Sequence, residues 1–373
     1  MHILHIVGAR PNFMKAAPVM RALGTWDGVR QTLVHTGQHY DANMSDVFFH
    51  DLEIPEPDIN LGVGSGSHAQ QTAQILNQLE PVLLEYRPDL VLVYGDVNST
   101  VAAALVCAKL LIPVGHVEAG LRSFDRTMPE EINRLVTDQI ADLLFTPSAD
   151  GDENLLREGV GADKIHCVGN VMIDSLVRLL SVAEKSTVLT NLNLKAGNYG
   201  LVTLHRPSNV DKPATLAAIM DALHEISREL IIIFCVHPRT RQSLQATNNH
   251  TPSSRVRMLD PLSYIDFLAL QRSARLVITD SGGIQEETTY LGIPCLTVRE
   301  NTERPVTVTF GTNILVGKDM SRLNTEVARI LAGNQKRGQV PRLWDGHAAD
   351  RIAQAVMTSS LSQFSSSIES ALS

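Results

Sequence analysis

Acidic side chains that could move protons follow short apolar runs in the first half of the chain. Asp96 and Glu118 each come shortly after such a run, and Glu130 opens a helical pattern. In a partly dry cleft a carboxylate can serve as a general acid or base. The structural alternatives are a helix N-cap for Asp96 and first-turn helix acids for Glu130 and Glu131. Only one of the adjacent pair needs a functional role.

The stretch Leu276–Glu287 is the pattern around which the second half is organised. An apolar β-branched run leads through two glycines into a helix start, whose unpaired N–H groups favour an anion. Ser281, Gly282 and Gly283 therefore predict a phosphate cradle. Glu287, about one turn into the helix, could accept the two vicinal hydroxyls of a ribose. The alternative is an ordinary capped helix.

Basic side chains at other strand ends fit an anionic ligand. Arg10 and Lys15 lie at a helix start, where positive charge opposes the helix dipole, so an anion partner is favoured over solvent. His205 ends a strand and could act as acid, base or phosphate partner, although a histidine there is more often structural. Arg304 could bring a guanidinium to a nucleotide. The chain has 13 histidines but no metal-ligand spacing, so we expect no metal.

These residues need elements that bring strand ends together. Continuous apolar runs separated by helical patterns predict buried parallel strands in βαβ units, and hence an α/β fold. The predicted strands, about six in each half, are Ile3–Val7, Thr32–His35, Leu90–Tyr94, Pro113–Val117, Leu143–Thr146, Ile165–Val168, Leu201–Leu204, Ile231–Val236, Val256–Leu259, Leu276–Ile278, Cys295–Val298 and Ile314–Val316.

The two halves predict two doubly wound Rossmann-type domains with a ligand site in the cleft between them. We expect an N-terminal domain with the carboxylates at 1–170, a C-terminal domain with the phosphate cradle at 171–355, and a tail at 356–373 that is a weak helix or disordered.

Composition narrows the class of protein. The 373 residues carry a net charge of −8, which argues against a nucleic-acid or anionic-membrane surface. Four cysteines without C-x-x-C spacing fit reduced thiols in a cytoplasmic protein. No apolar run approaches the ~20 residues that span a bilayer.

Several motifs together resemble one family, the non-hydrolysing UDP-N-acetylglucosamine (UDP-GlcNAc) 2-epimerases. The resemblance runs in order from Ile3 to about Ile352. The motifs are Gly8–Lys15, His116–Arg122, Met128–Arg134, Thr279–Glu287 and Asn301–Pro305. The resemblance implies a GT-B-like fold, a homodimer and no cofactor. It also implies interconversion of UDP-GlcNAc and UDP-ManNAc, which supplies precursors of surface polysaccharide.

The resemblance also implies roles for individual residues. The implied catalytic residues are Asp96, Glu118, Glu130 and His205. The implied UDP-sugar contacts are Arg10, Lys15, Leu262, Phe267, Ser281, Gly282, Gly283, Glu287 and Arg304, with Leu262 acting only through its backbone.

The implied chemistry is elimination followed by re-addition. The sugar C2 hydrogen is not next to a carbonyl, so we expect anti elimination of UDP to 2-acetamidoglucal and return of UDP to C1. This route needs a base at C2, a proton donor on the other face and positive charge on the diphosphate. Which carboxylate serves which face stays open.

The same sequence also fits another substrate and two other functions. His35–Asp41 and Leu204–Asn209 also resemble epimerases of UDP-2,3-diacetamido-2,3-dideoxyglucuronate. The segment His35–Asp41, together with Gly64–His68, lacks the Arg-bearing pattern of members activated by a second UDP-GlcNAc. A GT-B glycosyltransferase would use the same UDP cradle but would need an acceptor groove. A non-catalytic nucleotide-sugar sensor would not need the three carboxylates together.

Overall fold

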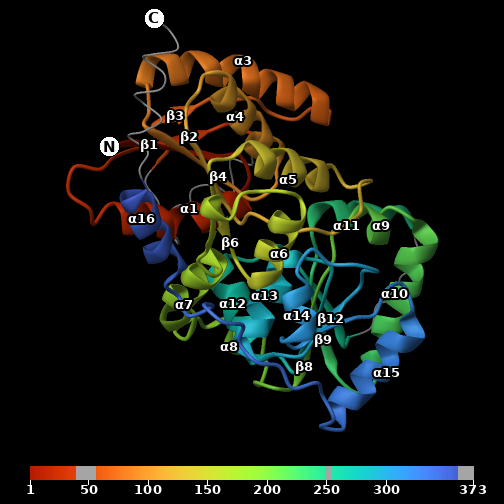
Figure 1. The fold of residues 1–373 in the computed structure, drawn as a ribbon. Helices are drawn as coiled ribbons and strands as arrows, with labels where there is room; N and C mark the ends of the chain where they lie inside the picture. The colour runs from red at the N-terminus through yellow and green to blue at the C-terminus, as the bar shows by residue number, and fades with distance from the viewer. Residues whose placement is uncertain (39–55, 248–253, 360–373) are drawn as a thin grey trace, which may run out of the picture. The chain divides into compact units, whose positions relative to one another are not determined.

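The computed structural model of this chain describes residues 1–38, 56–247 and 254–359. The chain divides into two compact units (Figure 1). The first unit contains Met1–Ser175 together with the chain from Arg342 onward, and the second contains Leu176–Pro341. The predicted boundary between 170 and 171 differs from this division by a few residues. A larger difference is that the segment from Arg342 belongs to the first unit.

The first unit is built on a parallel sheet whose described strands follow the order β3-β2-β1-β4-β5-β6-β7. The strands are β1 (His2–Val7), β2 (Arg30–His35), β3 (Ile59–Asn60), β4 (Leu90–Tyr94), β5 (Val114–Val117), β6 (Leu143–Thr146) and β7 (Ile165–Cys167). The helices are α1 (Arg10–Leu23), α3 (His68–Tyr86), α4 (Asn98–Lys109), α5 (Pro129–Ile140), α6 (Ala149–Arg157), a 3-10 turn (Ala162–Lys164), α7 (Val171–Ala183), which runs on into the second unit, and α16 (Ala348–Thr358).

The second unit repeats the plan with a parallel sheet in the order β10-β9-β8-β11-β12-β13. Its strands are β8 (Tyr199–Thr203), β9 (Ile231–Cys235), β10 (Val256–Leu259), β11 (Leu276–Thr279), β12 (Cys295–Thr297) and β13 (Asn313–Leu315). Its helices are α8 (Val188–Asn191), α9 (Pro207–Val210), α10 (Pro213–Ile226), α11 (Pro238–Thr247), α12 (Tyr264–Ser273), α13 (Gly282–Leu291), α14 (Pro305–Thr309) and α15 (Met320–Leu331).

Both sheets reverse their strand order at one place, between β1 and β4 in the first unit and between β8 and β11 in the second. In a doubly wound sheet the chain leaves the strands on either side of this switch point toward opposite faces, which opens a crevice at their carboxyl ends. All twelve predicted strands are present, and the GT-B-like class with two Rossmann-type domains is confirmed. The two-residue strand β3 was missed because its run is too short to show a period.

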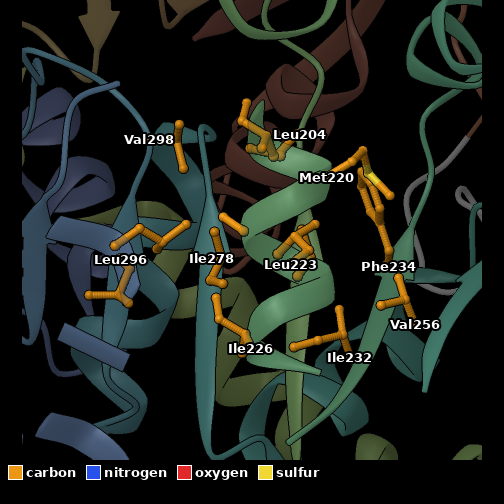
Figure 2. Close-up of a cluster of buried hydrophobic side chains, with 14 of the residues drawn as sticks. Leu204, Met220, Leu223, Ile226, Ile232, Phe234, Val256, Ile278, Leu296 and Val298 are labelled. Atoms are coloured by element: carbon orange, nitrogen blue, oxygen red, sulfur yellow. The ribbon is translucent and has the colours of Figure 1, made fainter. Parts of the chain in front are cut away.

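Helix α10 shows how the apolar pattern builds the core of the second unit. Pro213 occupies the first helical turn, where its missing N–H costs nothing. Leu216, Ile219, Met220, Leu223 and Ile226 then repeat every three or four residues and form one buried face. Figure 2 shows the labelled members of this face packed over side chains of the sheet. The sheet contributes Ile232, Phe234, Val256, Ile278, Leu296 and Val298.

The segment from Arg342 is fixed to the first unit by contacts that are distant in sequence. The Trp344 indole nitrogen donates a hydrogen bond to the Pro147 carbonyl at 2.9 Å, and the Trp344 ring is buried. The Asp174 carboxylate accepts hydrogen bonds from the Ala348 and Ala349 N–H groups at 3.1 and 2.6 Å. Asp174 therefore caps α16 across more than 170 residues of chain, which no local pattern could reveal. The predicted tail beyond Ser359 lies outside the described residues.

No helix in the described ranges is long and apolar enough to cross a membrane. The same ranges contain no group of three or more histidine, cysteine or acidic side chains that could hold a metal ion.

We predict that Asp174→Ala loosens α16 without unfolding the sheet. Losing a carboxylate cap costs about 1–2 kcal/mol, so hydrogen–deuterium exchange of the peptide 348–358 should accelerate roughly tenfold. The control is Glu80→Ala, which removes an exposed acid from α3. Unchanged exchange in α16 would show that the cap does not hold the helix.

Candidate active site

The switch point of the first unit is held together by Asn12. Its side-chain oxygen accepts the Gly8 and Ala9 N–H groups at 3.1 and 2.9 Å, and its amide donates to the Tyr94 carbonyl at 2.7 Å. The end of β1 and the end of β4 are thereby tied to the first turn of α1. This arrangement positions the residues that leave both strands.

Lys15 and Glu118 form a buried ion pair at these strand ends. The Lys15 Nζ lies 2.6 Å from the Glu118 Oε2, and both side chains are almost fully buried. Gly95 makes the approach possible, because a Cβ there would lie 2.6 Å from Nζ, and its φ of +65° is left-handed. Glu118 itself has a φ of +76°. Such a conformation costs about 1–3 kcal/mol in a residue with a Cβ and is often found at functional sites.

Asp96 is held from α5. Its carboxylate pairs with Arg134 Nη1, and its backbone carbonyl accepts a hydrogen bond from the Asn133 amide at 2.8 Å. The Asp96 side chain keeps 24% of its surface exposed, unlike that of Glu118. It is therefore oriented by a cation while remaining open to solvent or a ligand.

The two adjacent acids of α5 have different surroundings. Glu131 is buried and accepts hydrogen bonds from the Ser123 and Phe124 N–H groups at 3.0 and 2.9 Å, and it pairs with Arg134 at 2.7 Å. Burial alone would raise the pKa of Glu131, but the Ser123 and Arg134 contacts outweigh it and hold the pKa below its usual value. Glu130 is half-buried, and its side chain has no hydrogen bond or ion pair among the described residues. The structural role thus belongs to Glu131.

A second buried network supports the loop that carries Glu118. His116 contacts Asp138 at 2.6 Å through one ring nitrogen and the Gly95 carbonyl at 2.8 Å through the other. Asp138 also pairs with Arg122 at 2.7 Å. Burial would raise the pKa of Asp138, but His116 and Arg122 outweigh it and lower the pKa. This network links β4, β5 and α5 behind the candidate acids.

In the second unit, buried Asp280 ties the two strands at the switch point. Its carboxylate accepts hydrogen bonds from the His205 and Arg206 N–H groups at 3.1 and 2.9 Å and from the Asn209 side-chain amide at 3.0 Å. The same carboxylate lies 3.0 Å from His205 Nδ1. Burial would raise the pKa of Asp280, but His205 and these donors outweigh it and lower the pKa. The His205 side chain remains 41% exposed. Asp280 therefore holds His205, the predicted phosphate partner, in place, while the imidazole ring stays partly exposed.

The predicted cradle is a helix start with one arginine, Arg304, packed against it. Ser281 is the N-cap residue of α13, and Gly282 is the first helical residue. A Cβ on Gly282 would lie 2.4 Å from Arg304 Nη1, so a larger residue there would displace the Arg304 side chain. Arg304 pairs with Glu286 at 2.7 Å and with Glu303 at 2.6 Å. Gly283 follows in the first turn, where helix N–H groups lack intrahelical acceptors.

The predicted nucleoside contacts come from α12 and α13. Glu287 is buried and accepts a hydrogen bond from the Tyr264 hydroxyl at 2.7 Å. Tyr264 begins α12, Leu262 lies two residues before it, and Phe267 lies one turn later. Both Leu262 and Phe267 are half-buried. The residues predicted for ribose and base are thereby grouped by one hydrogen bond between the two helices.

Each unit therefore gathers its own share of the predicted site residues. In the first unit the Lys15–Glu118 pair lies against Gly95, the residue before Asp96. In the second unit His205 and Ser281–Gly283 follow the two strands of the switch point, and Arg304 lies against Gly282. The Arg10 side chain lies outside the description, although its backbone begins α1. Whether the two sets share one cleft stays a prediction.

Sequence reasoning missed the residues that hold the site residues in place. These are Asn12, Arg134, Asp138, Tyr264, Asp280 and Glu303. Arg134 carried a usable signal, since a cation three residues after Glu131 is positioned to pair with it on a helix. Asp138, Tyr264 and Asp280 meet partners that are more than 20 residues away in sequence, so the fold alone brings them together.

Comparison with known proteins decides the family. A family model described as UDP-N-acetylglucosamine 2-epimerase matches residues 21–357. The chain belongs to this family. It is an epimerase, and the resemblance found in its motifs is confirmed.

Two relatives of this epimerase are equally similar to it but differ in substrate. A UDP-N-acetylglucosamine 2-epimerase from Methanocaldococcus jannaschii is 43% identical over 95% of this chain and 98% of the relative. The UDP-2,3-diacetamido-2,3-dideoxy-D-glucuronate 2-epimerase of Pseudomonas aeruginosa is also 43% identical, over 95% of this chain and 99% of the relative. A crystal structure of the M. jannaschii enzyme in complex with UDP-GlcNAc and UDP matches with a TM-score of 0.89, covering 96% of this chain and 100% of that chain.

We predict that Asp280→Asn destabilises the epimerase most at neutral pH. The lowered pKa of Asp280 means that its contribution is present above the unfolded-state pKa of about 3.9 and is lost as pH falls through the folded-state value. The free energy of unfolding in urea should drop by about 1–3 kcal/mol at pH 7, and the difference should shrink toward pH 4 and below. Asp221→Asn, at an exposed acid of α10, is the control. A difference that grows in acid would contradict the assignment.

Proposed function

We propose that this epimerase interconverts UDP-GlcNAc and UDP-ManNAc by eliminating and re-adding UDP. The observation that carries the proposal is the pair of cation-held carboxylates, Asp96 and Glu118, at the ends of neighbouring strands in a member of this family. A base takes the proton from C2 while the C1–O bond to the diphosphate breaks. The electron pair of the C1–O bond leaves with UDP, and a C1=C2 double bond forms.

The return step needs a proton from the opposite face of C2. We assign proton transfer to Asp96, Glu118 and Glu130, without fixing which acid serves which face. Asp96 keeps access to a ligand, and Glu118 has Lys15 beside it to stabilise negative charge. Glu130 adds a third carboxylate, which forms no hydrogen bond or ion pair among the described residues.

The leaving diphosphate needs positive charge, and the second unit supports that role. His205, Arg304 and the N–H groups at the start of α13 are the proposed stabilisers, and the family resemblance implies that Arg10 and Lys15 also contact the UDP-sugar. Glu287 is the proposed ribose acceptor, with Leu262 and Phe267 at the base. Arg10 enters this proposal only through the family resemblance.

The diacetamido uronate is a second candidate substrate because its epimerase is as similar to this chain as the archaeal UDP-GlcNAc enzyme. The elimination at C1 and C2 is the same for both sugars. They differ at C3 and C6, so a change of substrate leaves the proposed carboxylate roles intact.

Three wider parts of the proposal rest on the family resemblance. They are assembly as a homodimer, a cytoplasmic location, and supply of precursors for surface polysaccharide.

The decisive test is incubation of the purified protein with UDP-GlcNAc in D2O, followed by proton NMR. We expect UDP-ManNAc to appear with deuterium at C2, together with traces of 2-acetamidoglucal and free UDP. Exchange with the diacetamido uronate alone would keep the mechanism and change the substrate. Absence of exchange with both sugars would refute the proposed reaction.

The adjacent acids of α5 provide a matched pair of variants. Glu130→Gln should lower kcat by about 10²–10⁴-fold, the usual contribution of a general acid or base, without changing the thermal midpoint. Glu131→Gln should instead lower stability by about 1–3 kcal/mol, because it replaces an acceptor of two backbone N–H groups and Arg134. The NMR assay and thermal unfolding measure the two effects. If Glu130→Gln keeps full kcat, Glu130 has no role in proton transfer.

A further inference from the structure

A cavity of about 430 Å³ lies at the carboxyl ends of β12 and β13, the two strands farthest from β10 in the second sheet. It does not involve the α13 cradle or the residues assigned to the nucleotide. Three of its lining side chains are cations. The lining residues are Arg299, Glu300, Leu315, Val316, Gly317, Lys318, Asp319 and Arg322.

Arg299 is the buried cation of this cavity. Its side chain is 4% exposed, and its Nη2 donates to Glu303 Oε2 at 2.6 Å. Its Nη1 is also buried but has no hydrogen-bond partner among the described residues. A buried guanidinium N–H without an acceptor is unfavourable, and an acceptor in the cavity would satisfy it.

The two carboxylates of the cavity are engaged by backbone groups. Glu300 accepts the Lys318 N–H at 3.3 Å and lies against Gly317, whose φ is +64°. Asp319 caps α15 by accepting the Arg322 N–H at 3.0 Å. Both contacts involve the loop between β13 and α15, which lines the cavity.

The cationic groups of Lys318 and Arg322 are left for a ligand. In the part of the chain that the structure describes, neither forms an ion pair with a carboxylate. Both belong to exposed residues, so their side chains can reach an ion at the opening. Asp319, the N-cap residue of α15, also lines the cavity, so the positive end of the α15 dipole lies beside it.

We propose that this cavity binds a phosphate group, carried by inorganic phosphate or by a phosphate monoester. A guanidinium provides a planar fork for two phosphate oxygens, and an ammonium adds a point charge. Arg299, Lys318 and Arg322 thus offer donors to a tetrahedral anion. The cavity is larger than one phosphate ion needs, which leaves room for an organic group.

The test is calorimetric titration of phosphate into the full-length protein after its nucleotide site has been saturated with UDP. Saturation separates the cavity from the α13 cradle, where phosphate could also bind. We expect saturable binding that weakens at least about tenfold in Lys318→Ala/Arg322→Ala, since each variant residue loses a charge-assisted hydrogen bond. The matched control, Lys212→Ala/Arg329→Ala, removes two cations of the same unit that lie outside the cavity.

Each outcome decides for or against the site. Tighter binding of glycerol 3-phosphate than of inorganic phosphate would support the site and identify an organic ligand, while the reverse order would support the site for the free ion. No saturable binding of either probe to the UDP-saturated protein would overturn the proposal. Equal binding to the cavity variant and the control variant would also overturn it. Thermal unfolding and UDP affinity of both variants verify that the fold is intact.

Discussion

A carboxylate removed from water must be met by donors or cations, and this requirement determines much of the geometry described here. Asp138, Asp280, Glu131 and Glu303 are all almost fully buried. Leaving such a charge unpaired would cost several kcal/mol, which is comparable with the net stability of a domain. Each of these acids is therefore surrounded by backbone N–H groups, arginine or histidine. The loops that supply those donors have little freedom to move independently.

The buried acids act as anchors for the groups that could do chemistry. Asp280 fixes the turn that carries His205, and Glu131 orients the Arg134 that holds Asp96. Glu303 pairs with both Arg299 and Arg304. The same carboxylate therefore orients an arginine of the α13 cradle and an arginine of the cavity at the ends of β12 and β13. The burial of Glu303 would raise its pKa, but the arginines outweigh it and keep the pKa well below its usual value. Fixed dipoles and charges of this kind cost little reorganisation when charge develops in a reaction.

Sequence reasoning was most successful where a pattern is local. Apolar runs of three to six residues located the strands, and Gly282 with the acids after it located the start of α13. That only one acid of the Glu130–Glu131 pair has a function stays a prediction. The family motifs correctly indicated an epimerase.

The partners of those residues could not be predicted in the same way. Asp280 meets His205 across 75 positions of the chain, and His116 meets Asp138 from another element. The connection of the last helix to the first unit depends on Asp174 and Trp344, which carry no periodic signal. Such contacts follow from which strands become neighbours, and the order of strands is a property of the whole sheet.

The return of the chain to the first unit has a consequence for how the protein is made. Because Leu176–Pro341 lies between two parts of the same unit, the second unit is topologically an insertion in the first. A ribosome releases Trp344 and α16 only after the entire second unit has been synthesised. The second unit can thus complete its sheet while the chain is still attached, whereas the first must wait for its last segment. During synthesis, the part of the first unit that α16 later covers stays without that helix for the whole time the inserted unit is being made.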